Sequence, residues 1–158
     1  MPLSPSIIGM HYRYPDFYEV GREKVREYAV AVKNDDSVYF DEGAAANLGH
    51  ESLPAPLTFI SVFGYTAQTA FFANANIGIT DAQIVQVDQE LKFLLPIKVG
   101  DRLYCDVYVH AYRHAHGTDI IVTKNIITND KGEAVQETYT TLAGRSDDTG
   151  EGFSNGTA

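Results

Sequence analysis

Three aspartates and a histidine lie within KNDDSVYFDEGAAANLGH, residues 33–50, between an amphipathic stretch and a long apolar one. Carboxylate and imidazole groups suit proton transfer at neutral pH, because their surroundings can set their pKa near the working pH. Asp35, Asp36 and Asp41 could therefore provide a general acid and base, or ligands for a metal ion. Aspartates in a polar loop also cap helices and turns, and for this loop we favour capping.

The histidines offer few further sites. His114 and His116 lie two residues apart in the polar stretch RHAHGTD, but a zinc site needs three or four protein ligands and no third is evident nearby. We therefore predict no metal site and no organic cofactor. His50, just before the long apolar segment, is the remaining candidate for a base, although an ordinary loop histidine is the simpler interpretation.

Length and composition indicate one globular domain. The 158 residues are 44% hydrophobic and 21% charged, and 21 acidic against 12 basic residues give a net charge of -9. Such a surface repels phosphate groups, which argues against nucleic acid as a partner. Cys105 is the single cysteine, so an internal disulfide is excluded. We find neither a signal-peptide pattern nor the roughly 20 apolar residues of a membrane span, and expect a cytoplasmic protein.

Three helices are predicted in the first half of the chain. The first has a buried stripe at positions i, i+3, i+4 and i+7, formed by Val25, Tyr28, Ala29 and Val32. The second is short, with Asp41 as its N-cap and Gly49 just past its end. The third spans residues 57–75, between Pro56 in its first turn and Gly78 beyond its end. Apolar or small side chains cover nearly every direction of this third helix, which predicts that it is buried on all sides.

The rest of the chain has the patterns of β-strands. Residues 83–93 alternate between polar side chains and the apolar side chains of Val85, Val87, Leu91 and Phe93, as in a half-buried strand. In residues 103–112 one face carries Leu103, Cys105, Val107, Val109 and Ala111. The other face carries Tyr104, Tyr108 and Tyr112 and is suited to a protein partner. Residues 118–128 and 134–144 are also β-rich, and the absence of helical patterns between these last three strands predicts an antiparallel sheet.

A long buried helix followed by strands that are each apolar on one face can pack in few ways. We predict an α+β hot-dog fold over residues 1–145, in which an antiparallel sheet wraps around the central helix. The remaining residues, 146–158, are rich in Gly, Ser, Asp and Thr and are expected to form a disordered tail.

Several blocks of the sequence resemble a known family. LPAPLTF and QIVQVDQELKFLLPIKVGDRL look like the MaoC-like branch of hot-dog proteins, which contains (R)-specific enoyl hydratases and dehydratases, and the resemblance covers residues 8–145. More narrowly, GMHYRYPDFYEVGREKVREYAVAVKNDD, APLTF, QIVQVDQ and VQETYTTLAGR are similar to one subunit type of the heteromeric (3R)-hydroxyacyl-ACP dehydratase of mycolic acid synthesis. The resemblance implies a heterodimer with a second hot-dog chain and an active site between the two subunits.

The catalytic loop of this family carries an aspartate and, five positions later, a histidine. Aligned on the sequence YFD, this chain has Asn34 and Tyr39 at those positions. An amide has no titratable proton, and a phenol ordinarily titrates at about pH 10, so neither replaces the dyad in hydrating a trans-2-enoyl thioester. In relatives the buried helix begins near His-Gly-Met, where backbone N–H groups stabilise the developing enolate, whereas Pro56 here has no N–H.

The resemblance also implies a channel for an acyl chain along the buried helix. Ser61 and Tyr65 lie four residues apart on one helix face and either bond to the backbone or line this channel, with Gly64 leaving room beside them. Gln86 and Asn125 are further candidates for the channel wall.

We therefore predict a substrate-binding, non-catalytic subunit of a hydro-lyase, the (3R)-hydroxyacyl-ACP dehydratase of type-II fatty acid and mycolic acid elongation, whose partner supplies the aspartate and histidine. Acyl carrier protein would deliver a long-chain substrate. Because both proteins are acidic, we expect the carrier to dock on the partner, or beside Arg102 or Lys124. Two alternatives stay open: a homodimer that binds acyl thioesters without catalysis, and an active homodimeric enoyl hydratase that uses Tyr39 or His50 as an unusual base.

Overall fold

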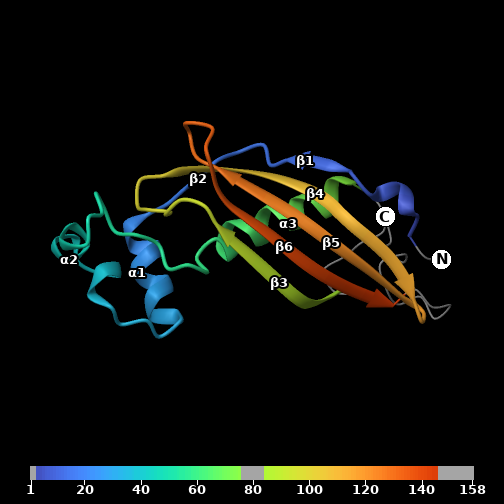
Figure 1. Cartoon of the computed structure of the whole chain (residues 1–158), viewed down its shortest axis with the longest axis horizontal. Helices are drawn as coiled ribbons and strands as arrows, with labels where there is room; N and C mark the ends of the chain where they lie inside the picture. Colours follow the sequence, from blue (N-terminus) through green and yellow to red (C-terminus); the bar gives the residue numbers. More distant parts are fainter. Residues whose placement is uncertain (1–2, 76–83, 146–158) are drawn as a thin grey trace.

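The structure, a computed structural model, describes residues 3–75 and 84–145. Six antiparallel strands form a sheet in the order β1-β4-β5-β6-β3, and β2 also pairs with β4. The strands are β1 (His11–Arg13), β2 (Tyr18–Glu19), β3 (Val85–Phe93), β4 (Arg102–Ala115), β5 (Thr118–Thr128) and β6 (Ala134–Arg145). The α-helices are α1 (Arg22–Ala31), α2 (Glu42–Asn47) and α3 (Ser61–Ala75), and short 3-10 helices cover Pro5–Ile7 and Ser37–Tyr39. Figure 1 shows α3 running along one face of the sheet, which confirms the predicted arrangement, and α1 and α2 gathered at one end.

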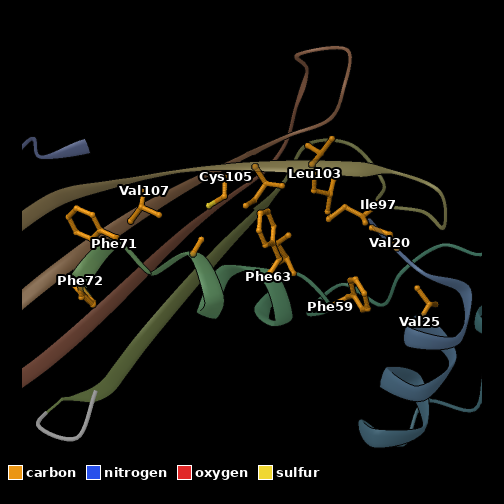
Figure 2. Packing of buried hydrophobic residues seen from close by; sticks show 14 of the residues in the cluster. Val20, Val25, Phe59, Phe63, Phe71, Phe72, Ile97, Leu103, Cys105 and Val107 are labelled. Atoms are coloured by element: carbon orange, nitrogen blue, oxygen red, sulfur yellow. The ribbon is translucent and has the colours of Figure 1, made fainter. Parts of the chain in front are cut away.

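The hydrophobic core lies between α3 and the inner face of the sheet. Phe63 and Phe71 from α3 point toward the strand that carries Leu103 and Cys105, and Phe59, from the turn before α3, lies nearer to α1 (Figure 2). None of these five side chains is more than 2% exposed. The alternation of apolar residues in β4 therefore packs against an aromatic row on the helix, as expected for a strand with one buried face.

Tyrosines of the N-terminal segment complete this core. The Tyr12 ring packs against Phe71 with centroids 6.1 Å apart, and Tyr14 and Tyr18 contact Phe63 at 5.5 and 5.4 Å. These tyrosine rings therefore pack against the core of their own chain.

Two of the three loop aspartates, Asp36 and Asp41, cap helices as predicted. Oδ1 of Asp36 accepts the N–H of Val38 at 3.1 Å, and Oδ2 of Asp41 accepts the N–H of Ala44 at 2.9 Å. Gly49 follows α2 with φ of +87°, a left-handed conformation that glycine adopts without strain. Both predicted ends of the short helix are therefore confirmed.

The central helix differs from its prediction in two ways. It begins at Ser61 rather than Leu57, because tight turns precede it, with the Phe59 N–H bonded to the Pro56 carbonyl at 2.9 Å. It is also not buried on all sides in the single chain, because the sheet covers only one of its faces. The exposed residues of α3 are Tyr65, Thr66, Ala73 and Asn74.

The first helix is shorter than its pattern predicts. Val25 and Ala29 are fully buried, but α1 ends at Ala31, so Val32 becomes the C-cap residue and is 46% exposed. The predicted helix end at Gly78 and the predicted tail, residues 146–158, lie outside the described residues.

A β-bulge in β4 changes which side chains face the core. An extra residue in one strand of a pair breaks the alternation of faces. The bulge lies between Val109 and Ala111, so Tyr112 pairs with the buried Ile121 on the inner face. The predictions that Ala111 lies on the inner face and Tyr112 on the outer face are therefore wrong.

A second bulge changes β3. It lies between Gln86 and Asp88, so Gln86 and Gln89 pair with the inward-facing Leu142 and Thr140. The prediction that β3 has one half-buried apolar face is wrong for the single chain. Among the described residues β3 is an edge strand with a neighbour on one side only, which leaves its apolar side chains exposed. The exposed apolar residues of β3 are Val85, Val87 and Phe93, at 64%, 59% and 49%.

Burial of Cys105 makes the stability of the fold sensitive to alkaline pH. Burial raises the pKa of the Cys105 thiol from 9.0 to about 12. Between these values the unfolded chain releases a proton that the folded chain retains, so the free energy of unfolding should fall as pH rises from 9 to 12, by up to about 4 kcal/mol.

Urea unfolding between about pH 8 and pH 11 measures this effect, with Cys105→Ala as the comparison. The variant is expected to lose less stability over the range than the wild type. Equal losses in both proteins would show that the thiol does not contribute.

Candidate functional site

A cavity of about 240 Å³ lies between the first half of α3 and the strands β3, β5 and β6. All four site residues predicted from the sequence line it: Ser61 and Tyr65 from α3, Gln86 from β3 and Asn125 from β5. Gln86 faces the cavity because of the bulge in β3. The fold thus brings together residues that are far apart in the sequence, and their role in binding a substrate stays a prediction.

Sequence reasoning missed further polar residues of the same wall, namely Gln68, Gln89, Thr138 and Thr140. The two threonines occupy alternate positions of β6, on the inner face that also carries Gln136 and Leu142. Among the lining residues only Ile60 and Gly64 lack a polar side-chain group.

Three buried side chains determine the hydrogen bonding beside the cavity. Oγ1 of Thr123 donates to Oε1 of Gln68 at 3.1 Å, so this pair is satisfied. Asn125 is only 3% exposed, yet its Oδ1 has no hydrogen-bond partner among the described residues. A Cβ atom at Gly64 would lie 3.4 Å from Nδ2 of Asn125, so the glycine lets the helix pass close to this amide.

The chemistry of the cavity is that of binding by hydrogen bonds. Among the described residues that line it, Tyr65 is the only one with an ionisable side chain. General acid and base catalysis needs a pair of groups that titrate near the working pH, and amides and aliphatic hydroxyls do not. The wall can orient a ligand, but it does not provide an acid and a base.

The residues at the dyad positions lie elsewhere, in the connection between α1 and α2. Oδ1 of Asn34 accepts the N–H of Asp36 at 3.2 Å, directly after Lys33 with its positive φ of 59°. Tyr39 ends a 3-10 helix and packs partly buried against the core. Neither residue lines the cavity. Asn34 therefore has a structural role in shaping this loop.

The histidines are not brought to the cavity. The His50 N–H bonds to the Ala45 carbonyl at 3.0 Å and helps to end α2. Nδ1 of His114 is 3.1 Å from Oδ1 of the buried Asp119, while His116 sits in the hairpin turn with φ of 51°. Within the described part of the chain no cluster of three or more His, Cys, Asp and Glu side chains is suited to a metal ion.

The backbone N–H groups of the turn before α3 are largely used within the turn. The N–H groups of Phe59, Ser61 and Val62 bond to carbonyls within this turn at 2.9, 3.1 and 3.0 Å. Together with Pro56, which has no N–H, this leaves few backbone donors for a developing negative charge.

None of the described helices combines the length and apolarity needed to cross a membrane.

The fold is shared with solved dehydratase structures. A MaoC-like dehydratase aligns with a TM-score of 0.83 and 35% identity, over 90% of this chain and 43% of its own. The C-terminally truncated HadBC complex, a (3R)-hydroxyacyl-ACP dehydratase from Mycobacterium tuberculosis, aligns with a TM-score of 0.80 and 47% identity, over 87% of this chain and 97% of that chain. The predicted α+β hot-dog fold is therefore confirmed as that of the MaoC-like dehydratases.

Sequence comparison narrows the class. Residues 6–138 match the family described as FAS1-like, dehydratase domain region. UPF0336 protein Rv0635 of Mycobacterium tuberculosis is 69% identical over 158 residues, which is 100% of both chains. UPF0336 protein ML1908 of Mycobacterium leprae is 47% identical over 94% of this chain and 89% of its own. The chain therefore belongs to the FAS1-like dehydratase family and shares the UPF0336 family with these mycobacterial proteins.

Proposed function

We propose that this chain is the substrate-binding, non-catalytic subunit of a heteromeric (3R)-hydroxyacyl-ACP dehydratase, most like the subunit HadA, and that it pairs with a catalytic HadB-like hot-dog chain. The assembled hydro-lyase interconverts 3-hydroxyacyl and trans-2-enoyl thioesters in type-II fatty acid and mycolic acid elongation. The observation that carries the proposal is a polar cavity of about 240 Å³ in a chain whose dyad positions hold Asn34 and Tyr39.

The reaction explains why a partner is needed. In hydration a base takes a proton from water as its oxygen attacks C3, and an acid delivers a proton to C2. The cavity wall of this chain consists mainly of amides and hydroxyls, which can hold the acyl part of a thioester in place. The aspartate and histidine come from the partner, and no cofactor takes part.

The edge of the sheet supports pairing with another chain. β3 ends the sheet and pairs only with β6 among the described residues, so its other edge is open to a second protein. We call the exposed apolar residues around it the β3 edge surface. They are Leu57, Tyr65, Val85, Val87, Phe93, Leu94 and Leu95, each at least 41% exposed. A row of apolar side chains beside an open strand is typical of a protein interface.

The test is hydration of a trans-2-enoyl thioester by the chain purified alone, and then by the chain co-expressed with a hot-dog companion that has an intact Asp-x4-His motif. We expect no turnover by the chain alone and turnover by the pair. An aspartate-to-asparagine variant of the companion should abolish it. Turnover by the chain alone would overturn the proposal in favour of an active homodimer. Tight thioester binding without turnover in any pairing would favour the homodimeric binding protein.

The carrier protein is expected to contact the outer face of the sheet beside Lys124. Nζ of Lys124 and Nζ of Lys92 lie 5.5 and 5.2 Å from the centre of the Tyr139 ring, so two cations gather at this ring, next to the carboxylates of Glu90 and Glu137 on the paired strands β3 and β6. Changing both lysines to glutamate should raise KM for carrier-linked substrates about tenfold, because it repels the acidic carrier.

The control substrate is the same acyl group on pantetheine, which lacks the carrier, and the control variant is Lys131→Glu in the exposed β5–β6 turn. The double variant should keep the wild-type KM for the pantetheine substrate, and Lys131→Glu should keep the wild-type KM for the carrier-linked substrate. An unchanged KM for carrier-linked substrate in the double variant would remove Lys92 and Lys124 from consideration.

A further inference from the structure

Gly64 lies at a position of α3 where the backbone does not require a glycine. It is the fourth residue of the helix, and its N–H bonds to the Ile60 carbonyl at 2.8 Å, as in a regular helical turn. Its φ is not positive, in contrast to that of Gly49. Glycine destabilises a helix relative to alanine, because it loses more backbone freedom on folding. The reason for a glycine here therefore lies outside the helix backbone.

The space beside Gly64 would accept a small side chain. A Cβ atom at this position would lie 3.4 Å from Nδ2 of Asn125, which is an ordinary contact distance. No other described atom beyond the adjoining residues and the backbone of the helix would come within 4 Å of it. Because Gly64 lines the cavity, a side chain at this position would occupy the cavity rather than collide with the fold.

Gly64 stands between the open rim of the cavity and its buried floor. The rim carries Tyr65 and the edge-strand residue Gln86, which are both exposed in the single chain. The floor carries Asn125 and Thr140, which are 3% and 4% exposed. Gly64 is next to Tyr65 in the helix and faces Asn125 across the cavity. A ligand that enters at the rim therefore passes Gly64 on its way to the floor.

The reacting end of a substrate would lie at the rim. Tyr65 belongs to the β3 edge surface, where the companion chain with the aspartate and histidine is proposed to bind. The thioester has to meet those two groups, so it stays at the rim and the acyl chain extends toward the floor. Although most lining residues are polar, carbon atoms form more of the exposed wall than nitrogen and oxygen atoms do. The wall can therefore contact a hydrocarbon chain.

We propose that Gly64 determines which acyl chain lengths the dehydratase accepts, because its missing side chain leaves the way to the floor of the cavity open. This inference rests on the proposed function and adds to it a specificity-determining residue. A short acyl chain stays at the rim and does not meet position 64. A long chain has to pass this position, where even one or two added methyl groups would stand in its way.

The experiment measures kcat/KM of the full chain, assembled with its companion, on plain trans-2-enoyl pantetheine thioesters of increasing chain length. For the shortest substrates Gly64→Val should stay within about twofold of the wild type, whereas for chains that reach the floor kcat/KM should fall about tenfold or more. Gly64→Ala should show the same trend with a smaller loss, and it provides a second variant if the valine does not fold. The readout is the ratio of long-chain to short-chain kcat/KM.

The matched control is Ala73→Val, which enlarges an exposed side chain of the same helix that does not line the cavity. This variant should keep the wild-type ratio. A second measurement tests whether the fold needs the glycine. Because alanine favours a helix more than glycine does, Gly64→Ala should not lower the midpoint of urea unfolding.

Three outcomes would overturn the inference and leave the proposed function standing. One is a wild-type ratio for Gly64→Val in a pair that still turns over the short substrate. Another is an equal loss on short and long substrates, which would show that the side chain disturbs assembly or the thioester. The third is a lower urea midpoint for Gly64→Ala, which would show that the fold requires the glycine. If the wild-type pair turns over no substrate of any length, the proposed function fails and this inference with it.

Discussion

Replacing Phe63 with alanine is expected to lower the free energy of unfolding by about 3–5 kcal/mol, the usual range for deleting a buried phenylalanine side chain. Phe63 is 2% exposed and lies between α3 and β4, with the rings of Tyr14 and Tyr18 at 5.5 and 5.4 Å. The alanine would leave a cavity that these rigid rings cannot close. Equilibrium unfolding in urea, followed by far-UV circular dichroism, measures the loss.

Val30→Ala is the matched control, because Val30 is 66% exposed on α1 and should change the free energy of unfolding by about 0.5 kcal/mol or less. A loss below about 1 kcal/mol for Phe63→Ala would show that α3 is not packed against the sheet as described.

The double variant Val85→Lys, Val87→Lys is expected to abolish assembly with the companion chain. Both valines are well exposed on the β3 edge surface, at 64% and 59%, so the single chain should fold normally. In the assembly their ammonium groups would be buried without partners, and the affinity should fall by at least about a hundredfold. Light scattering during size-exclusion chromatography measures the assembled fraction. Turnover of the enoyl thioester should be lost together with assembly.

The control pair is Val30→Lys, Val32→Lys, which again changes two exposed valines two residues apart, but at the end of α1. This pair should leave assembly intact. A β3 variant that still assembles would show that the partner binds at another face of the sheet.

Much of the fold could be predicted because it follows from local patterns. The alternation in β4, the caps at Asp41 and Gly49 and the apolar character of α3 each depend on residues close in sequence. The two bulges could not be predicted, because a bulge depends on the register with a neighbouring strand. The exposed face of α3 could not be predicted either. In a helix that is apolar on all sides, the sequence does not indicate which side packs on the sheet of the same chain and which side stays exposed in the single chain.

The candidate site divides in the same way. Ser61 and Tyr65 stand out as polar residues in an apolar helix, and Asn125 as an amide in a β-rich stretch. Gln86 is turned inward only by the bulge in β3, whereas Gln89 lies on the odd-numbered face that was predicted to be buried, where it is the one polar residue of β3 and was missed. The close approach of Gly64 to Nδ2 of Asn125, and the lack of a hydrogen-bond partner for Oδ1 among the described residues, are tertiary features that no local pattern contains.

The order of the strands along the chain has a consequence for synthesis on the ribosome. α3 is complete at Ala75, but the strands that cover it, β4 to β6, are finished only at Arg145. At about 5–20 residues per second, these roughly 70 residues take about 4–14 seconds to make. During that time the most apolar helix of the protein lacks the sheet against which it packs and has only the tyrosines of the N-terminal segment as partners. Chaperones that bind nascent chains, and the rate of translation through the β-strands, should therefore determine how much of this protein reaches its native state in a foreign host.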